Sequence, residues 1–234
     1  MRNLILLALT APALQRSSAF LPPWPPTWNM SLSTAFMPCD ADTPGPIPFP
    51  PAVAARWGIA DTDWSNGRFW YSKQSPMNAE ETLLAQAQAN HALNPDAKQM
   101  VYRNAIKALP WFSSVREKLQ DKQYWGWFLP YKNCTQLNCG PNATQNLYHD
   151  FEQTPRGDCG AGVECGEYLF DLRNASCRAW LRTEYLLGPT GLGSPAVRGF
   201  YFDDVSASKK HAQTSSPPHP FSAFFTLFPN FPSD

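Results

Sequence analysis

Apolar runs that end in polar or charged side chains recur along the chain, and each run has the length of a buried strand. Short apolar runs bounded by turn residues are typical of strands in a buried parallel sheet. Two further segments, residues 29–37 and residues 124–131, predict a first strand and either a buried strand or the approach to one. The clearest runs are WGIADTD (57–63), KQMVYRN (98–104), EYLFDLRN (167–174) and GFYFDDV (199–205).

Three stretches between these runs carry the features of helices. Residues 75–95 have Pro76 near the start, Glu80 and Glu81 in the first turn, and Asn94-Pro95 at the end, which is the order expected of a helix. Residues 109–123 and 175–188 have apolar side chains at roughly helical spacing, and Asn174 is a candidate cap for the latter. Alternating strands and helices predict an α/β fold with a parallel sheet, a (β/α)8 TIM-barrel-like architecture with about six strands.

The candidate functional residues are the polar side chains at the carboxyl ends of these predicted strands. Because carboxyl ends of parallel strands meet at one edge, we expect these side chains to share a rim, where active sites of β/α barrels lie. An open doubly wound sheet would bind ligands at the same edge. A strand that ends in a solvated turn is the structural alternative. The predicted rim residues are Asp61, Asp63, Arg103, Asn104, Asp171, Asp203 and Asp204.

Carboxylates beside aromatic side chains favour a carbohydrate ligand, since aromatic rings stack on sugars and two carboxyls can cleave a glycosidic bond. Neighbouring residues of a strand point to opposite faces, so Asp203 and Asp204 are not expected to form the catalytic pair together. The predicted partner is Asp171 or Asp63. Asp171 has a structural alternative as well, in which it pairs with Arg173 or caps the following helix.

Composition and motifs narrow the function classes. The formal net charge of zero argues against nucleic acid or an anionic membrane surface as partner, because both select basic proteins. The chain lacks the glycine-rich nucleotide motifs and the G-x-S-x-G motif. Its four histidines are scattered and there is no C-x-x-C, so we predict no metal site and no cofactor.

The N-terminus predicts export. Residues 1–19 contain Arg2, an apolar run and a small-residue end, as a secretory signal peptide does; a buried N-terminal helix is the alternative. No later apolar run is long enough for a membrane helix. Six cysteines predict disulfides and no free thiol, with Cys134–Cys139 and Cys159–Cys165 paired by nearness. The possible glycosylation sites are Asn29, Asn133, Asn142 and Asn174.

GFYFDDV, together with YRN (102–104) and DTDW (61–64), resembles the pattern of TIM-barrel glycoside hydrolases grouped as hypothetical glycosyl hydrolase families. The resemblance covers roughly residues 28–205 and implies a catalytic role for Asp203 or Asp204. It implies a substrate-pocket role for Asp63, Arg103 and Asn104. Tyr102, Trp64 and His149 are added as candidate sugar contacts. Their structural alternatives are a buried salt bridge and cap at residues 102–104, core packing for Trp64, and a loop hydrogen bond between His149 and Asp150.

The predicted organisation is a signal peptide (1–19), a glycosidase-like barrel domain (20–206) and a disordered or non-native tail (207–234). The barrel segment is shorter than the roughly 250 residues that a full barrel uses, which suggests truncation after about Val205. The predicted function is a secreted glycoside hydrolase. The alternative is a non-catalytic secreted carbohydrate-binding glycoprotein, or an inactive fragment of such an enzyme.

Overall fold

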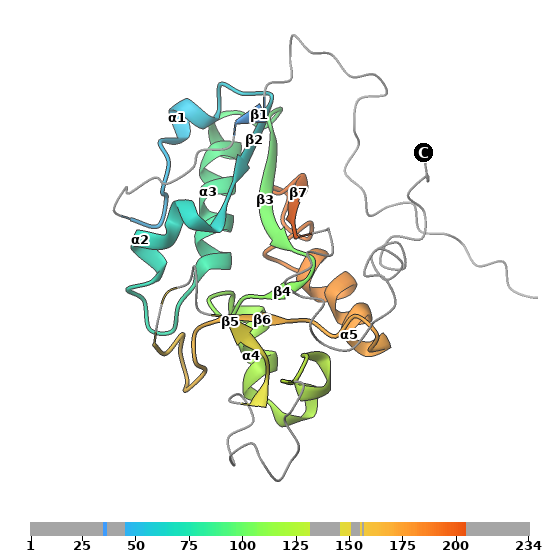
Figure 1. Cartoon of the computed structure of the whole chain (residues 1–234). Helices are drawn as coiled ribbons and strands as arrows, with labels where there is room; N and C mark the ends of the chain where they lie inside the picture. The colour runs from blue at the N-terminus through green and yellow to red at the C-terminus, as the bar shows by residue number, and fades with distance from the viewer. Residues whose placement is uncertain (1–34, 37–44, 132–145, 151–154, 156, 205–234) are drawn as a thin grey trace, which may run out of the picture.

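A computed structural model describes residues 35–36, 45–131, 146–150, 155 and 157–204 of the 234-residue chain (Figure 1). The predicted signal peptide, the predicted Cys134–Cys139 pair and the predicted tail (207–234) lie outside these residues. Among the possible glycosylation sites, only Asn174 lies within them. In the described part of the chain, no helix is both long enough and apolar enough to cross a membrane.

A four-stranded parallel sheet forms the centre of the fold. Its order is β1 (Ala35–Phe36), β2 (Ile59–Thr62), β3 (Lys98–Asn104) and β7 (Gly199–Asp203), and every neighbouring pair is parallel. The α/β class and the strands predicted at 57–63, 98–104 and 199–205 are thereby confirmed. Within the described residues the sheet is open, with β1 and β7 at its edges.

Helices connect the strands of this sheet. The longest, α3 (Ala79–Leu93), carries Glu80 and Glu81 in its first turn as predicted and lies along β2 and β3 (Figure 1). Asn174 caps α5 as predicted, because its Oδ1 accepts the N–H groups of Ser176 at 3.0 Å and Cys177 at 3.3 Å. The remaining helical segments are α1 (Pro51–Ala54), η2 (Trp64–Gly67), α2 (Arg68–Tyr71), α4 (Ser113–Gln120), η3 (Lys122–Trp127), α5 (Ala175–Trp180) and η5 (Leu181–Leu186).

A second, antiparallel sheet lies beyond the carboxyl end of β3 (Figure 1). It has the order β4 (Lys107–Ala108), β6 (Glu167–Leu169) and β5 (His149–Asp150). The strand predicted at 167–174 is therefore real but does not belong to the parallel sheet, which corrects the expected count of about six barrel strands. Two consecutive strands can be parallel neighbours only if a long crossover, usually a helix, connects them. The described residues between β5 and β6 form no helix, which agrees with the antiparallel pairing of these two strands.

The two faces of β3 have different surroundings, and Arg103 marks the face that packs against the helices. We call this the rear face of the sheet. Arg103 is fully buried and its guanidinium lies 3.5 Å from Glu80 of α3, which is equally buried. The guanidinium also donates to the backbone oxygens of Tyr185 (3.2 Å), Tyr102 (2.9 Å) and Thr190 (2.8 Å). Each nitrogen of this buried guanidinium therefore has a hydrogen-bond acceptor, as a buried charge requires.

Glu80 extends this contact to a third element. Its Oε2 accepts the backbone N–H of Ser114 at 2.8 Å and the hydroxyl of Ser113 at 3.2 Å, both in the first turn of α4. A carboxylate at a helix N-terminus satisfies backbone N–H groups that lack a partner within the helix. The Arg103–Glu80 pair thus ties β3 to α3, α4 and the segment around Thr190.

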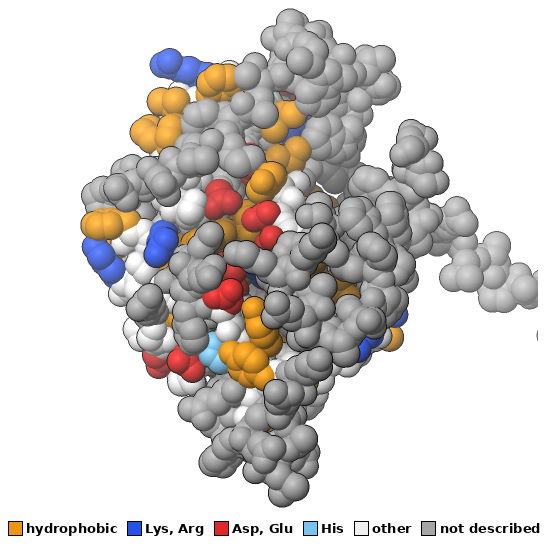
Figure 2. Space-filling model, viewed as in Figure 1, with side chains coloured by type: hydrophobic (Ala, Val, Ile, Leu, Met, Phe, Trp, Pro, Cys, Tyr) orange, Lys and Arg blue, Asp and Glu red, His pale blue; other side chains and the backbone are white. Residues whose placement is uncertain are grey.

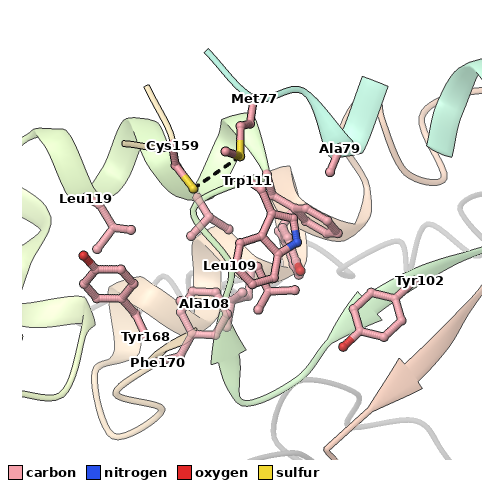
Figure 3. Packing of buried hydrophobic residues seen from close by; sticks show 14 of the residues in the cluster. Met77, Ala79, Tyr102, Ala108, Leu109, Trp111, Leu119, Cys159, Tyr168 and Phe170 are labelled. Carbon is pink, nitrogen blue, oxygen red and sulfur yellow. Dashed lines mark hydrogen bonds between the residues drawn. The ribbon is translucent and has the colours of Figure 1, made fainter. Parts of the chain in front are cut away.

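One hydrophobic core joins the two sheets. Trp111, Leu109 and Ala108, which follow β3, pack with Tyr168 and Phe170 at β6, as Figure 3 shows. The disulfide predicted between Cys159 and Cys165 is confirmed. Cys159 Sγ lies 3.6 Å from Met77 Sδ, which places the disulfide against this core (Figure 3). The second sheet is thus fixed to the parallel sheet by packing as well as by the chain.

Cys177 corrects the expectation that no thiol is free. Its side chain is unpaired and fully buried in α5, where Sγ lies 3.8 Å from the backbone oxygen of Trp127. Burial raises the pKa of the thiol to about 12, so it stays protonated and behaves as a small apolar side chain. The even number of cysteines gave no information on which of them pack rather than pair.

Replacement of Glu80 by Ala should destabilise the protein by about 3–5 kcal/mol, because it leaves the buried Arg103 guanidinium without its carboxylate. Urea unfolding of the full chain measures this change. The matched control is Glu81→Ala, in the same helical turn but exposed, which should cost less than about 1 kcal/mol. Equal, small effects of the two substitutions would contradict the importance given to the Arg103–Glu80 pair.

Candidate functional site

The register of β2, β3 and β7 places a set of polar and aromatic side chains on one face of the sheet. This is the face opposite Arg103, and we call it the front face. Asp61 pairs with Met100, Tyr102 with Tyr201, and Asn104 with Asp203. Because side chains of a strand alternate between faces and paired residues share a face, Asp61, Tyr102, Asn104, Tyr201 and Asp203 all project from the front face. These five residues come from the carboxyl halves of β2, β3 and β7.

Tyr102 and Asn104 link the acids of β7 to the middle of the sheet. The Tyr102 hydroxyl lies 3.1 Å from Asp203 Oδ2 and 2.8 Å from Asn104 Nδ2. Asn104 Nδ2 also donates to Asp204 Oδ2 at 2.7 Å. Burial and the charge of Asp203 raise the pKa of Tyr102 well above its usual value, so the hydroxyl keeps its proton and donates a hydrogen bond to the Asp203 carboxylate. Both acids are thus oriented by β3.

Asp203 and Asp204 lie on the same side of the sheet, which corrects the prediction that they point to opposite faces. Alternation requires extended backbone at both residues, but β7 ends at Asp203 and Asp204 has a φ of 55°. Asp is one of the few residues that adopt this left-handed conformation, helped by local hydrogen bonds. Here the Asp204 N–H donates to Asp203 Oδ1 at 2.7 Å.

The second sheet contributes a Lys–Glu pair to this group. Lys107 Nζ lies 3.2 Å from Asp204 Oδ2 and 2.7 Å from Glu167 Oε2. Burial alone would lower the pKa of Lys107, but the hydrogen bond and charge of Glu167 outweigh it and the pKa is raised. Burial raises the pKa of Glu167 in spite of Lys107. A single ammonium therefore serves two carboxylates where β4 and β6 meet the carboxyl end of β7.

Asp61 differs from the other acids of the site. It is 6 % exposed, and its Oδ1 has no hydrogen-bond partner among the described residues. Burial, together with the charge of Asp63, raises its pKa to about 7. A buried carboxyl oxygen without a partner is uncommon in native structures and is a mark of functional sites. Asp61 is thus a carboxylic acid that keeps its proton in mildly acidic conditions.

Asp63 and Trp64 lie at the edge of the site and also hold the local fold. Asp63 caps η2, because its Oδ1 accepts the Ser65 N–H at 2.7 Å while Asn66 Oδ1 accepts the Asp63 N–H at 2.8 Å. The Trp64 ring lies 5.1 Å from Trp111 and 6.4 Å edge-on from Tyr102. Trp64 is partly buried against the core, which agrees with its structural alternative.

Three predicted site residues lie elsewhere. Arg103 is fully buried on the rear face with Glu80, as its structural alternative stated, so the substrate contact expected for it is corrected. Asp171 follows β6 instead of a parallel strand, and its carboxylate binds Arg173 Nε at 2.8 Å. His149 lies in β5, where its ring stacks 4.9 Å from Tyr168 and Nδ1 lies 2.7 Å from the Leu147 oxygen.

Sequence reasoning missed Lys107 and Glu167 as members of the site, and it predicted Tyr201 to be buried. Tyr201 is 36 % exposed, and its position two residues before Asp203 was the signal that it shares the face of that acid. Lys107 and Glu167 carried no signal, because they reach the site only through the antiparallel pairing of β4 and β6. The space-filling view shows acidic side chains gathered in the middle of this side of the molecule (Figure 2).

Metal ligation has no obvious place in this arrangement. Among residues that the structure describes, no three His, Cys, Asp or Glu side chains are grouped in a way that could hold a metal ion. The arrangement instead offers a protonated acid at Asp61, carboxylate acceptors at Asp203 and Asp204, and a half-exposed ring at Tyr201.

Because of Asp61, the free energy of unfolding should fall as the pH rises. The folded protein holds the Asp61 proton up to about pH 7, whereas the unfolded chain releases it near its ordinary pKa of 3.8. Between these two pH values, loss of the proton therefore stabilises the unfolded state relative to the folded state. Relative to wild type, the Asp61→Asn variant should therefore gain about 3 kcal/mol in unfolding free energy between pH 5 and pH 8.

Urea unfolding at both pH values measures this gain. The control is Asp96→Asn, which removes an exposed acid before β3 and against which the change for Asp61→Asn is compared. A pH-independent difference for Asp61→Asn would contradict the raised pKa.

Comparison of the chain with protein-family models finds no matching family, and comparison with curated proteins finds no match. A function for this chain is therefore inferred from the geometry of the site and from the resemblance carried by the sequence motifs.

Proposed function

We propose that the front face of the parallel sheet binds a carbohydrate and hydrolyses a glycosidic bond. One observation carries the proposal: Asp61 on β2 and Asp203 on β7 project from the same face on either side of β3, and their environments differ. Asp61 is buried with a pKa of about 7, whereas Asp203 accepts hydrogen bonds at both carboxyl oxygens. Two carboxyls whose environments differ in this way can serve as acid and base.

Their spacing sets a condition on the proposal. Strands β2 and β7 are separated by β3, so their backbones lie about 10 Å apart, and Asp61 and Asp203 are offset by four residues, about 13 Å, along the strands, because they pair with Met100 and Asn104. Paired carboxyls of glycosidases are about 5–9.5 Å apart. For both acids to act on one glycosidic bond, their side chains must reach toward each other across the front face, as they would across the interior of a barrel.

In this proposal Asp61 donates its proton to the oxygen of the leaving sugar as the bond to the anomeric carbon breaks. Asp203 acts on the other side, either as nucleophile or as the base that takes a proton from the attacking water. The Tyr102 hydroxyl and the Asp204 N–H, at 3.1 Å and 2.7 Å, hold the Asp203 carboxylate in place. Tyr201, half exposed beside it, supplies a ring on which a sugar can stack.

The architecture agrees with a barrel enzyme. Strand order β1-β2-β3-β7 follows chain order without a reversal, as in a β/α barrel, whereas a doubly wound sheet reverses order at its ligand site. We propose that this sheet is part of such a barrel, with the second sheet inserted between β3 and β7. The Cys159–Cys165 disulfide supports an oxidising compartment and hence secretion.

The test is hydrolysis of a panel of neutral and charged oligosaccharides by the full chain. Asp203→Asn should lower kcat/KM by about 10²–10⁴, the usual contribution of a catalytic carboxyl, and leave the unfolding midpoint nearly unchanged. Asp96→Asn, at the opposite end of β3, is the matched control and should keep full activity. Activity that is equal in both variants would refute the role of Asp203.

Binding without turnover would point instead to a non-catalytic carbohydrate-binding glycoprotein. It would appear as saturable binding of one glycan by wild type and by Asp203→Asn, with no new reducing ends released by either protein. No binding and no turnover across the panel would contradict a carbohydrate function altogether.

A further inference from the structure

The front face and its border carry several negative groups. Asp63, Asp203 and Asp204 act electrostatically on the phenol of Tyr201, and Glu167 lies beside Asp204 through Lys107. Asp61, with a pKa of about 7, adds a negative charge only near neutral pH and above. The ammonium group of Lys107 is already shared between the carboxylates of Asp204 and Glu167. A ligand that approaches Tyr201 therefore meets carboxyl groups on both sides.

The nearest buried cation does not compensate for this excess. Arg103 precedes Asn104 in β3, but its guanidinium lies on the rear face and is paired with Glu80 at 3.5 Å. Its other donors are taken by backbone oxygens of Tyr185, Tyr102 and Thr190. The charge of Arg103 is thus balanced within the rear face, and the front face keeps its negative character.

Asp61 adds a second, independent observation that points to a ligand. Its side chain is more than nine-tenths buried, it projects from the front face beside β3, and its Oδ1 lacks a hydrogen-bond partner among the described residues. A buried acceptor without a hydrogen-bond partner destabilises the folded protein. A donor group on a ligand would satisfy this oxygen, and a charged donor would form the stronger hydrogen bond.

We infer that the substrate is a glycan with positively charged amino groups, that is, an amino sugar whose amine is not acetylated. This inference rests on the proposed carbohydrate function and names its substrate class. An ammonium group attached to the sugar ring donates hydrogen bonds to the carboxylates of Asp203 and Asp204 and is attracted by Asp63. An N-acetylated sugar of the same shape has no such charge, and a uronic acid is repelled.

The test compares two ligands that differ only in acetylation. Calorimetry of the full chain at pH 5.5 would measure binding of a β-1,4-linked glucosamine tetramer and of the corresponding N-acetylglucosamine tetramer. The glucosamine tetramer should bind about tenfold more tightly at low salt, and the ratio should shrink at 0.5 M salt because counterions screen the carboxylates (a Debye length of about 4 Å).

Charge-removing variants make the test specific to this site. Asp204→Asn should lower the preference for the glucosamine tetramer by at least about threefold, while Asp96→Asn removes the same charge at the other end of β3 and should leave it unchanged. Equal affinity for the two tetramers, or tighter binding of the acetylated one, would overturn the inference. A preference that Asp204→Asn and Asp96→Asn reduce alike would overturn the assignment to the front face.

Hydrolysis separates this inference from the proposed function. If neutral glycans are cleaved and the charged tetramer has no advantage in binding, the hydrolase proposal stands and the amino-sugar inference fails. If the charged tetramer is preferred but no glycan is cleaved, the inference on ligand class stands and hydrolysis fails.

Discussion

The buried ion pair between Arg103 and Glu80 is the contact on which the arrangement of the site depends. It lies behind β3, where the fully buried guanidinium binds a carboxylate and three backbone oxygens. Because Glu80 also accepts the Ser114 N–H, the same pair fixes α3 and α4 against the sheet. A charge that is buried in this way tolerates little displacement, since each lost partner would leave an unsatisfied group. Strand β3 is therefore held from the rear face, while on its front face the buried Tyr102 and Asn104 hydrogen-bond the acids of β7.

Alternation along β3 converts this fixed strand into an organised site. Tyr102 and Asn104 flank Arg103 in sequence and point to the opposite face, so the ion pair that holds Arg103 also holds them. Their hydrogen bonds pass this order to Asp203 and Asp204, and the left-handed turn at Asp204 brings both acids to one side. Asp61 faces this group from the other neighbouring strand. Packing on one face thus positions the acidic groups on the other.

The sequence was sufficient for much of this arrangement but not for all of it. Apolar runs with polar ends located β2, β3 and β7, because buried parallel strands and their carboxyl edge leave a local signature. The faces of Asp203 and Asp204 were mispredicted, since one left-handed residue cancels the alternation that the prediction assumed. Asp171 was placed on the wrong sheet, because strand direction depends on the connection and on the pairing partner. Lys107 and Glu167 reach the site through that same non-local pairing.

The most direct measurement is a crystal structure of the full chain with an uncleaved oligosaccharide, obtained with the Asp203→Asn variant. We predict a sugar ring against Tyr201, between β2 and β7, with the Asp61 carboxyl and the side chain at position 203 within about 3 Å of ligand oxygens or nitrogens. We also predict that the side chains at positions 203 and 204 both face Tyr102 and Asn104. A ligand bound elsewhere, or side chains at these two positions on opposite faces of the sheet, would contradict the proposed site.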